Sequence, residues 1–103
     1  MIILIDMADF KYIYVSDAVR ELLGYRPSDF VGHRAPLFNV ADDAPHVRIT
    51  MEDALLTGES VKVNIRFKTK NGLVQPIRGA VKRVIDPETD EVYLLTWVEA
   101  ADR

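Results

Sequence analysis

The segment FKYIYVSDAVRELLGYRPSDFVG, residues 10–32, decides the fold of this chain. Its first part, residues 12–15, is rich in aromatic and β-branched residues and favours a β-strand. The Ser-Asp pair that follows is typical of a helix N-terminus, and apolar residues at helical spacing predict a helix over residues 17–23. Gly24 suits the left-handed conformation that ends many helices. The segment therefore indicates a strand followed at once by a short capped helix.

The same patterns and turn signals predict the other elements. A long helix is expected to begin at Asp42 or Asp43, with Pro45 in its first turn, and to end at Gly58. Its apolar face consists of Val47, Met51, Ala54 and Leu55. In chain order, the expected elements are strands 2–6 and 11–15, helices 17–23 and 27–31, a turn near 35–39, a helix at 43–56, and strands 60–69, 73–85 and 91–99.

An Asn-Gly pair sets the register of a hairpin between the strands 60–69 and 73–85. A two-residue loop would put Ile77 on the solvent face. A three-residue loop over 70–72, with the glycine in the left-handed region, keeps Ile77 on the same face as Phe67, and this loop is predicted. The residues that then share a face with Phe67 are Leu73, Gln75, Ile77, Gly79 and Val81.

Length, charge and composition limit the class of protein. The 103 residues are enough for one domain, and 49% hydrophobic and 28% charged residues are ordinary globular values. A net charge of −3 argues against a general nucleic-acid binder. The absence of cysteine excludes disulfides, thiolate metal sites and cysteine nucleophiles. No apolar run approaches the ~20 residues of a membrane span. The absence of cysteine fits an intracellular protein, so a cytoplasmic location is expected, or a nuclear one if the parent is a transcription factor.

The ordered set of motifs along the chain resembles a PAS domain, a sensor and interaction module. The motifs are a strand ending in Val15-Ser16, the phrases Leu-Leu-Gly-Tyr at 22–25 and Pro-Ser-Asp-Phe-Val-Gly at 27–32, the Asp42-Asp43 helix start, and hairpins at 66–72 and 86–91. The resemblance implies an α+β fold, with a five-stranded antiparallel sheet and helices packed on one face. It also implies that residues 1–103 are a single domain, taken from a larger multidomain signalling protein.

Cofactor binding, which occurs in some PAS domains, is not expected here. The light-sensing LOV subgroup carries a reactive cysteine in a stretch that resembles residues 32–39, and this chain has Ala35 at that place. In the LOV subgroup the next residue is an arginine that would bind the flavin phosphate, whereas this chain has Pro36 there. The amide that would read the flavin ring corresponds to Ile77. A flavin is therefore disfavoured.

The histidines and carboxylates of the chain do not indicate a haem site, a metal site or a catalytic site. His33 and His46 do not match the position of the axial histidine in haem-binding PAS domains, so haem is disfavoured too. Asp42 and Asp43 lie close to His46 in sequence, but helix capping and the helix dipole explain them, and no metal is expected. The serines have no histidine nearby in sequence. No catalytic constellation is found, and the chain is not expected to be an enzyme.

A small-molecule pocket between the sheet and the long helix is the alternative function. Gly79 lies on the inward face of its strand, where glycine marks a bulge or a close approach. Gln75 and Thr96 could supply polar groups to an apolar cavity. If large neighbours fill the gap instead, Gly79→Leu should destabilise the protein, whereas a pocketed protein should tolerate it. The predicted lining residues are Phe38, Met51, Leu55, Ile65, Phe67, Gln75, Ile77, Gly79 and Trp97.

The strands 2–6 and 91–99 are apolar at both parities, which is typical of strands covered on both faces. In the PAS topology they lie side by side in the middle of the sheet, with helices on one face only. A partner, most simply a second copy of the domain, or a flanking helix is therefore expected to cover the outer face. The predicted interface residues are Ile3, Ile5, Val92, Leu94, Thr96 and Val98, with Tyr93, Leu95 and Trp97 as the mirror choice.

A basic stripe accompanies this face. It consists of Lys62, Arg66, Lys68, Arg78 and Lys82, which share the outward side of the predicted hairpin. The stripe is either a solvated surface or the border of the interface, where it would contact an acidic helix or a second copy. Arg66 and Arg78 are predicted to contribute to self-association.

Overall fold

The computed structural model describes residues 1–101 and contains a five-stranded sheet with strand order β2-β1-β5-β4-β3. Every neighbouring pair of strands is antiparallel, which confirms the expected α+β architecture. The elements in chain order are β1 (Ile2–Asp6), β2 (Lys11–Val15), α1 (Val19–Leu23), the 3-10 helices η1 (Pro27–Asp29) and η2 (Ala41–Asp43), α2 (Ala44–Thr57), β3 (Val61–Lys68), β4 (Val74–Ile85) and β5 (Val92–Ala100).

Helix α1 is shorter than predicted because Ser16 has a different role. Its hydroxyl accepts the N–H of Ile2 at 2.8 Å and so joins the end of β2 to the start of β1, instead of capping the helix. The regular helix begins only at Val19. It ends as expected at Gly24, which has φ 84°.

Helix α2 covers one side of the sheet. It ends at Gly58, whose φ of 70° is the expected left-handed value. Val47 and Ala54 are buried, as predicted for the apolar face. Thr50 is buried beside them although it is polar, because its hydroxyl donates to the carbonyl of His46 at 2.9 Å.

The hairpin of β3 and β4 has the predicted register. Phe67 pairs with Gln75 and Ile65 pairs with Ile77, so odd positions face odd positions. The Thr69 N–H donates to the Leu73 carbonyl at 2.7 Å and closes the three-residue loop. Leu73 was expected to begin this strand, but β4 begins at Val74, and Leu73 is 68% exposed in the turn before it.

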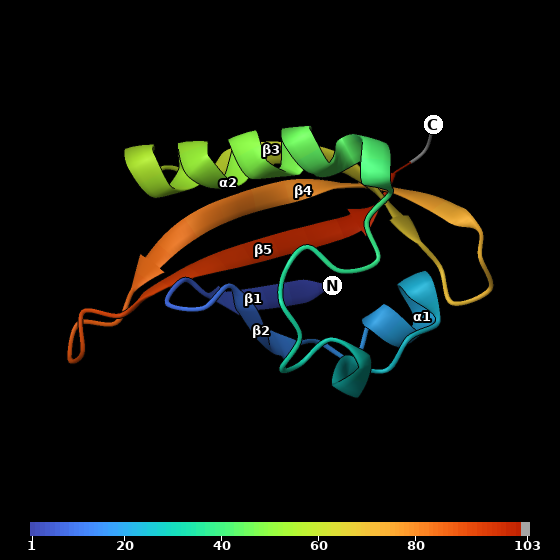
Figure 1. Cartoon of the computed structure of the whole chain (residues 1–103), viewed down its shortest axis with the longest axis horizontal. Helices are drawn as coiled ribbons and strands as arrows, with labels where there is room; N and C mark the ends of the chain where they lie inside the picture. The colour runs from blue at the N-terminus through green and yellow to red at the C-terminus, as the bar shows by residue number, and fades with distance from the viewer. Residues whose placement is uncertain (102–103) are drawn as a thin grey trace.

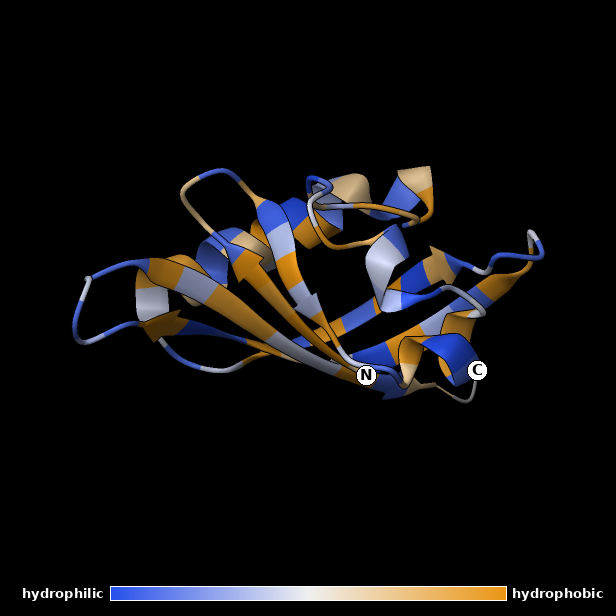
Figure 2. Cartoon of the chain, turned by 90° about the horizontal axis from the view of Figure 1, so that it is seen from below, coloured by the Kyte–Doolittle hydropathy of each residue, from blue (hydrophilic) through white to orange (hydrophobic). Residues whose placement is uncertain are grey.

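The helical layer lies over one face of the sheet. In Figure 1, α2 runs along β3 and β4, while the segment 31–43 crosses over β5, β1 and β2. Figure 2 shows the hydropathy of the strands: hydrophobic and hydrophilic residues alternate along β3, whereas β1 and β5 are hydrophobic at most positions. The core fills the space between the inner face of the sheet and the helical layer; its largest fully buried side chains are Val19, Leu23, Phe30, Ile77, Leu94 and Val98.

In β1 and β5, the side chains that face outward are not the ones predicted for the interface. Leu94 and Val98 are at most 1% exposed and face the helical layer, together with Ile3 and Ile5 of β1. The prediction failed because the residues at odd and at even positions of these strands are both apolar, so hydrophobicity did not indicate which set faces inward. The set predicted to face outward, Ile3, Ile5, Val92, Leu94, Thr96 and Val98, faces inward; the mirror set, Tyr93, Leu95 and Trp97, faces outward with Ile2 and Leu4.

Gly79 is explained by a close approach of the neighbouring strand. A Cβ atom on Gly79 would lie 1.7 Å from the carbonyl oxygen of Trp97 in β5. The glycine therefore allows β4 and β5 to pack closely and does not open a pocket. Gly79→Leu would disrupt the sheet whether or not a cavity exists, so this variant does not distinguish a filled core from a pocket.

Candidate functional site

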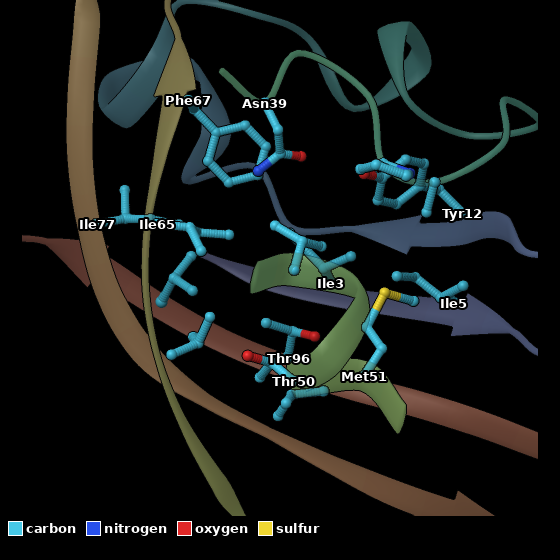
Figure 3. Close-up of a pocket in the computed structure, with 16 residues that line it drawn as sticks. Ile3, Ile5, Tyr12, Asn39, Thr50, Met51, Ile65, Phe67, Ile77 and Thr96 are labelled. Atoms are coloured by element: carbon cyan, nitrogen blue, oxygen red, sulfur yellow. The ribbon is translucent and has the colours of Figure 1, made fainter. Parts of the chain in front are cut away.

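A cavity of about 50 Å³ lies between the inner face of the sheet, α2 and the segment 35–39. Four residues of the predicted pocket line it, namely Met51, Ile65, Phe67 and Ile77 (Figure 3). Its walls are mostly apolar. The volume has room for a few water molecules or a very small organic molecule.

The other five predicted pocket residues lie elsewhere. Phe38 stacks on a neighbouring tyrosine, with 4.1 Å between ring centroids. Leu55 faces a surface cleft beside α2, and Gln75 donates to the carbonyl of the next residue at 2.8 Å. Gly79 lies against the backbone of β5, and Trp97 is 50% exposed on the outer face of the sheet.

Asn39 is a polar residue of the cavity that was not predicted from the sequence. The backbone groups on either side of it bond to Arg66 and Lys68 at the edge of β3, with distances of 3.1 and 2.7 Å. Asn39 thus lies opposite Phe67, and its side chain is part of the cavity wall (Figure 3). Its Nδ2 is buried and has no hydrogen-bond partner among residues 1–101. An unsatisfied buried donor costs about 1–3 kcal/mol, so the cavity is suited to an oxygen acceptor.

Two threonines lie on the other side of the cavity from Asn39 (Figure 3). Thr96 is one of the two polar side chains predicted for a cavity, and the structure places it in the wall, whereas Gln75 does not line it. Thr50 was not predicted, because hydrophobic periodicity identifies only the apolar residues on the buried face of a helix. The cavity thus combines an apolar surface with three polar side chains, a composition found in ligand sites.

Tyr12 forms the wall next to the segment 35–39. Its hydroxyl accepts the N–H of Leu37 at 3.0 Å, and its ring contacts Phe30 edge-on at 5.3 Å. Burial raises the pKa of Tyr12 to about 12, although the hydrogen bond from Leu37 acts in the opposite direction. The phenol is therefore neutral at physiological pH and holds the segment in place.

The cavity does not fit a large cofactor. Sites for drug-sized ligands usually measure ~300–1,000 Å³. A flavin ring system or a haem needs a space of at least that order, whereas this cavity measures about 50 Å³. That the domain works without a cofactor stays a prediction.

The outer face of the sheet is the second candidate surface. Strand pairing aligns Tyr14, Leu4 and Leu95 in one row, and Ile2 and Trp97 in the next. We call these five residues the outer patch. Ile2 is 41% exposed, Tyr14 51%, Leu95 39% and Trp97 50%. Leu4 is partly buried between these four exposed side chains. Contiguous exposed apolar side chains mark interaction sites more often than scattered single ones do.

Two residues of the basic stripe are already paired. Arg66 Nη2 lies 2.7 Å from Asp43 Oδ1, and Arg78 Nε lies 3.0 Å from Glu99 Oε1. The hydrogen bond from the Arg66 side chain is the main cause of the lowered pKa of Asp43. Arg66 thus ties the edge of the sheet to the start of α2. The other members of the stripe, Lys62, Lys68 and Lys82, are exposed.

The two ends of the long axis carry opposite charge. The β4–β5 turn is acidic, with Asp86, Glu88, Asp90 and Glu91 within residues 86–91. The β3–β4 turn carries Lys68 and Lys70 and lies at the opposite end of the molecule (Figure 1). We call these the acidic tip and the basic tip.

Within residues 1–101, no three histidine, cysteine, aspartate or glutamate side chains gather as metal ligands would. None of the helices in this part is long and apolar enough to cross a membrane.

The chain is an α+β domain in which helices cover one face of an antiparallel sheet of order β2-β1-β5-β4-β3. A small cavity lies between the sheet and the helices. A family model described as the PAS fold matches residues 12–98. The chain belongs to the PAS family, whose members act as sensory and interaction modules.

Solved structures show the same fold at low sequence identity. The PAS-B domain of Drosophila melanogaster Cycle with bound ethylene glycol has a TM-score of 0.84 and 15% identity, and the match covers 97% of this chain and 98% of that one. A variant of the same domain with bound glycerol gives 0.83, with equal identity and coverage. A PAS domain from Colwellia psychrerythraea gives 0.83 at 19% identity, covering 97% and 84%. A search of curated protein sequences finds no match.

Proposed function

We propose that this domain transmits signals by protein–protein contact, as a homodimer formed through the outer patch. The proposal rests on the outer patch, in which apolar side chains of β2, β1 and β5 lie next to one another on the outer face. The apolar residues of these strands exceed what the core can bury on one side. Desolvating the outer patch would supply the driving force for association.

Charge favours a second copy of the chain as the partner. In a two-fold symmetric dimer the same surface is used twice, so it must be complementary to itself. If the strands of the two copies run in opposite directions, the acidic tip of each lies against the basic tip of the other. Such an arrangement pairs opposite charges at both ends of the interface. A parallel arrangement would place like charges together.

Sedimentation velocity over a range of protein concentrations tests the dimer. Wild-type protein should shift from monomer to dimer as concentration rises, and salt should weaken the dimer because the charged tips are exposed. Leu95→Glu should stay monomeric. Leu56→Glu is the matched control, since Leu56 is 82% exposed on α2. A wild-type protein that stays monomeric, or a Leu95→Glu protein that still dimerises, would contradict the proposal.

A second function is supported by the orphaned Nδ2 of Asn39: the cavity would bind a very small molecule with an oxygen acceptor. The bound glycerol and ethylene glycol of the Cycle PAS-B structures are molecules of this kind. A polyol oxygen could accept from Asn39, while its carbon atoms contact the apolar wall.

An NMR titration with ethylene glycol tests this second function. Saturable shifts are expected for residues around the cavity, such as Ile65 and Thr96, and Asn39→Leu should abolish them. Asn64→Leu makes the same change on the exposed side of β3 and should leave them unchanged. Shifts that are absent in the wild type, or that survive in Asn39→Leu, would overturn the proposal.

A further inference from the structure

A cleft on the surface beside α2 has no part in either proposal above. Its volume of about 530 Å³ lies within the ~300–1,000 Å³ typical of small-molecule sites. One wall is formed by Phe10 and the segment 34–36, and the other by α2, including Arg48, Met51 and Leu55. Four residues line both the cleft and the inner cavity, so the two spaces are neighbours; they are Ala35, Pro36, Val47 and Met51.

Phe10 is held at this cleft by an unusual backbone conformation. Its φ is 59°, in the left-handed region, which is unfavourable for a bulky aromatic residue. The turn is fixed by the Ala35 N–H, which donates to the Phe10 carbonyl at 2.7 Å, and by the Lys11 N–H, which donates to Asp9 Oδ1 at 3.2 Å. The ring is 37% exposed at the mouth of the cleft. Backbone strain of this kind is concentrated at ligand sites.

Each wall of the cleft contributes one exposed arginine. Arg34 comes from the loop wall and Arg48 from the second turn of α2. Neither forms an ion pair with any other residue in 1–101. Glu52 is the acidic residue of the lining, so positive charge predominates locally on a chain whose net charge is −3. A ligand with a negative group therefore matches the cleft better than a neutral or cationic one.

The surroundings of the cleft favour a short ligand over an acidic peptide. Beyond Phe10 and Leu55 the surface continues into a second hollow, which is lined by Asp6 and Glu91. An acidic peptide that ran along both hollows would bring its charges close to these carboxylates. A compact molecule would end before reaching them.

We propose that this cleft binds a small apolar molecule that carries a single carboxylate. The carboxylate lies between Arg34 and Arg48, since guanidinium groups suit the geometry of a carboxylate. The apolar body packs on Phe10, Met51 and Leu55. This site is separate from the outer patch, and it shares only Ala35, Pro36, Val47 and Met51 with the inner cavity. Because its ligand is of another class, its failure would leave both earlier proposals standing.

The test uses phenylbutyrate as the probe and its neutral amide as the matched comparison, both titrated into isotope-labelled protein and followed by NMR. Phenylbutyrate should give saturable shifts at Phe10, Arg34 and the first three turns of α2. The amide should bind about five- to tenfold more weakly, the loss expected when a charge-assisted contact is removed.

Two double variants separate specific contacts from general electrostatics. Arg34→Gln with Arg48→Gln should remove the preference for the acid over the amide. Lys62→Gln with Lys82→Gln removes the same charge from the outer face and should leave that preference intact. Equal binding of acid and amide, no saturable binding, or shifts confined to the inner cavity or the outer patch would each overturn the proposal.

Discussion

The two faces of the central strands β1 and β5 are built from similar side chains but have different surroundings. Leu94 and Leu95 are adjacent in sequence, yet Leu94 has no exposed surface and Leu95 is 39% exposed. The inner face is covered by α2 and the segment 31–43, whereas no described residue covers the outer patch. The same apolar strand therefore contributes to the core on one side and leaves apolar side chains exposed on the other.

The largest effect is expected at Gly79, where β5 lies close to the backbone of β4. In Gly79→Ala the new Cβ would lie 1.7 Å from the Trp97 carbonyl oxygen, so β4 and β5 would have to separate. We expect a loss of more than about 4 kcal/mol in the free energy of unfolding, or no folded protein. Urea unfolding measures this.

Gly72→Ala is the control for that experiment. Its Cβ would meet no atom within 4 Å, so only the left-handed conformation opposes it. The expected cost is about 1–2 kcal/mol. If the two glycine variants lost equal stability, the close packing of β4 on β5 would be wrong.

The comparison of the two faces is sharpened by two neighbouring truncations. Leu94→Ala should lose about 2–5 kcal/mol of unfolding free energy, because it leaves a cavity in the core. Leu95→Ala should lose less than about 1 kcal/mol at concentrations where the protein is monomeric. Both are measured by urea unfolding. A larger loss for Leu95→Ala than for Leu94→Ala would reverse the assignment of the faces.

The smallest of these effects is expected at the edge where the two layers meet. Asp43 of the helical layer bonds to Arg66 of the outer face, and Asp43→Asn should cost about 1 kcal/mol, because solvent screens the exposed guanidinium. The contact lowers the pKa of Asp43 in the folded state. Its stabilisation is therefore fully present above the unfolded pKa of about 3.9 and is lost as pH falls through the folded pKa.

Thermal unfolding of wild type and Asp43→Asn at several pH values checks this sign. The difference in stability should be constant near neutral pH and should shrink below about pH 4. A difference that grows on acidification would contradict the assigned role of the pair.

The order and register of the elements could be predicted from the sequence where the pattern of residues was compatible with only one arrangement. The hairpin of β3 and β4 is such a case, because only the three-residue loop keeps Ile77 with Phe67. For β5, both parities are apolar and only the packed structure decides that Leu94 faces inward. The role of Ser16 was missed for a related reason, since its hydroxyl bonds to a residue that is distant in sequence.

The candidate site was harder to predict than the fold. Asn39 lies in a segment without hydrophobic periodicity, and its direction is set by bonds to the edge of β3. Gly79 was correctly noted as a point of close approach, but sequence does not tell whether a ligand or a strand approaches. The outer patch could be expected in kind, since excess apolar residues are visible in sequence, but not in its exact members.

The fluorescence of Trp97 tests the central claim most directly, because it is the one tryptophan of the chain and lies in the outer patch. If the outer patch forms a homodimer, concentrated protein should emit at shorter wavelength and resist quenching by acrylamide. Dilution should then shift the emission to longer wavelength as the dimer dissociates, and added salt should move the midpoint to higher concentration. Emission and quenching that do not depend on protein concentration would contradict the account.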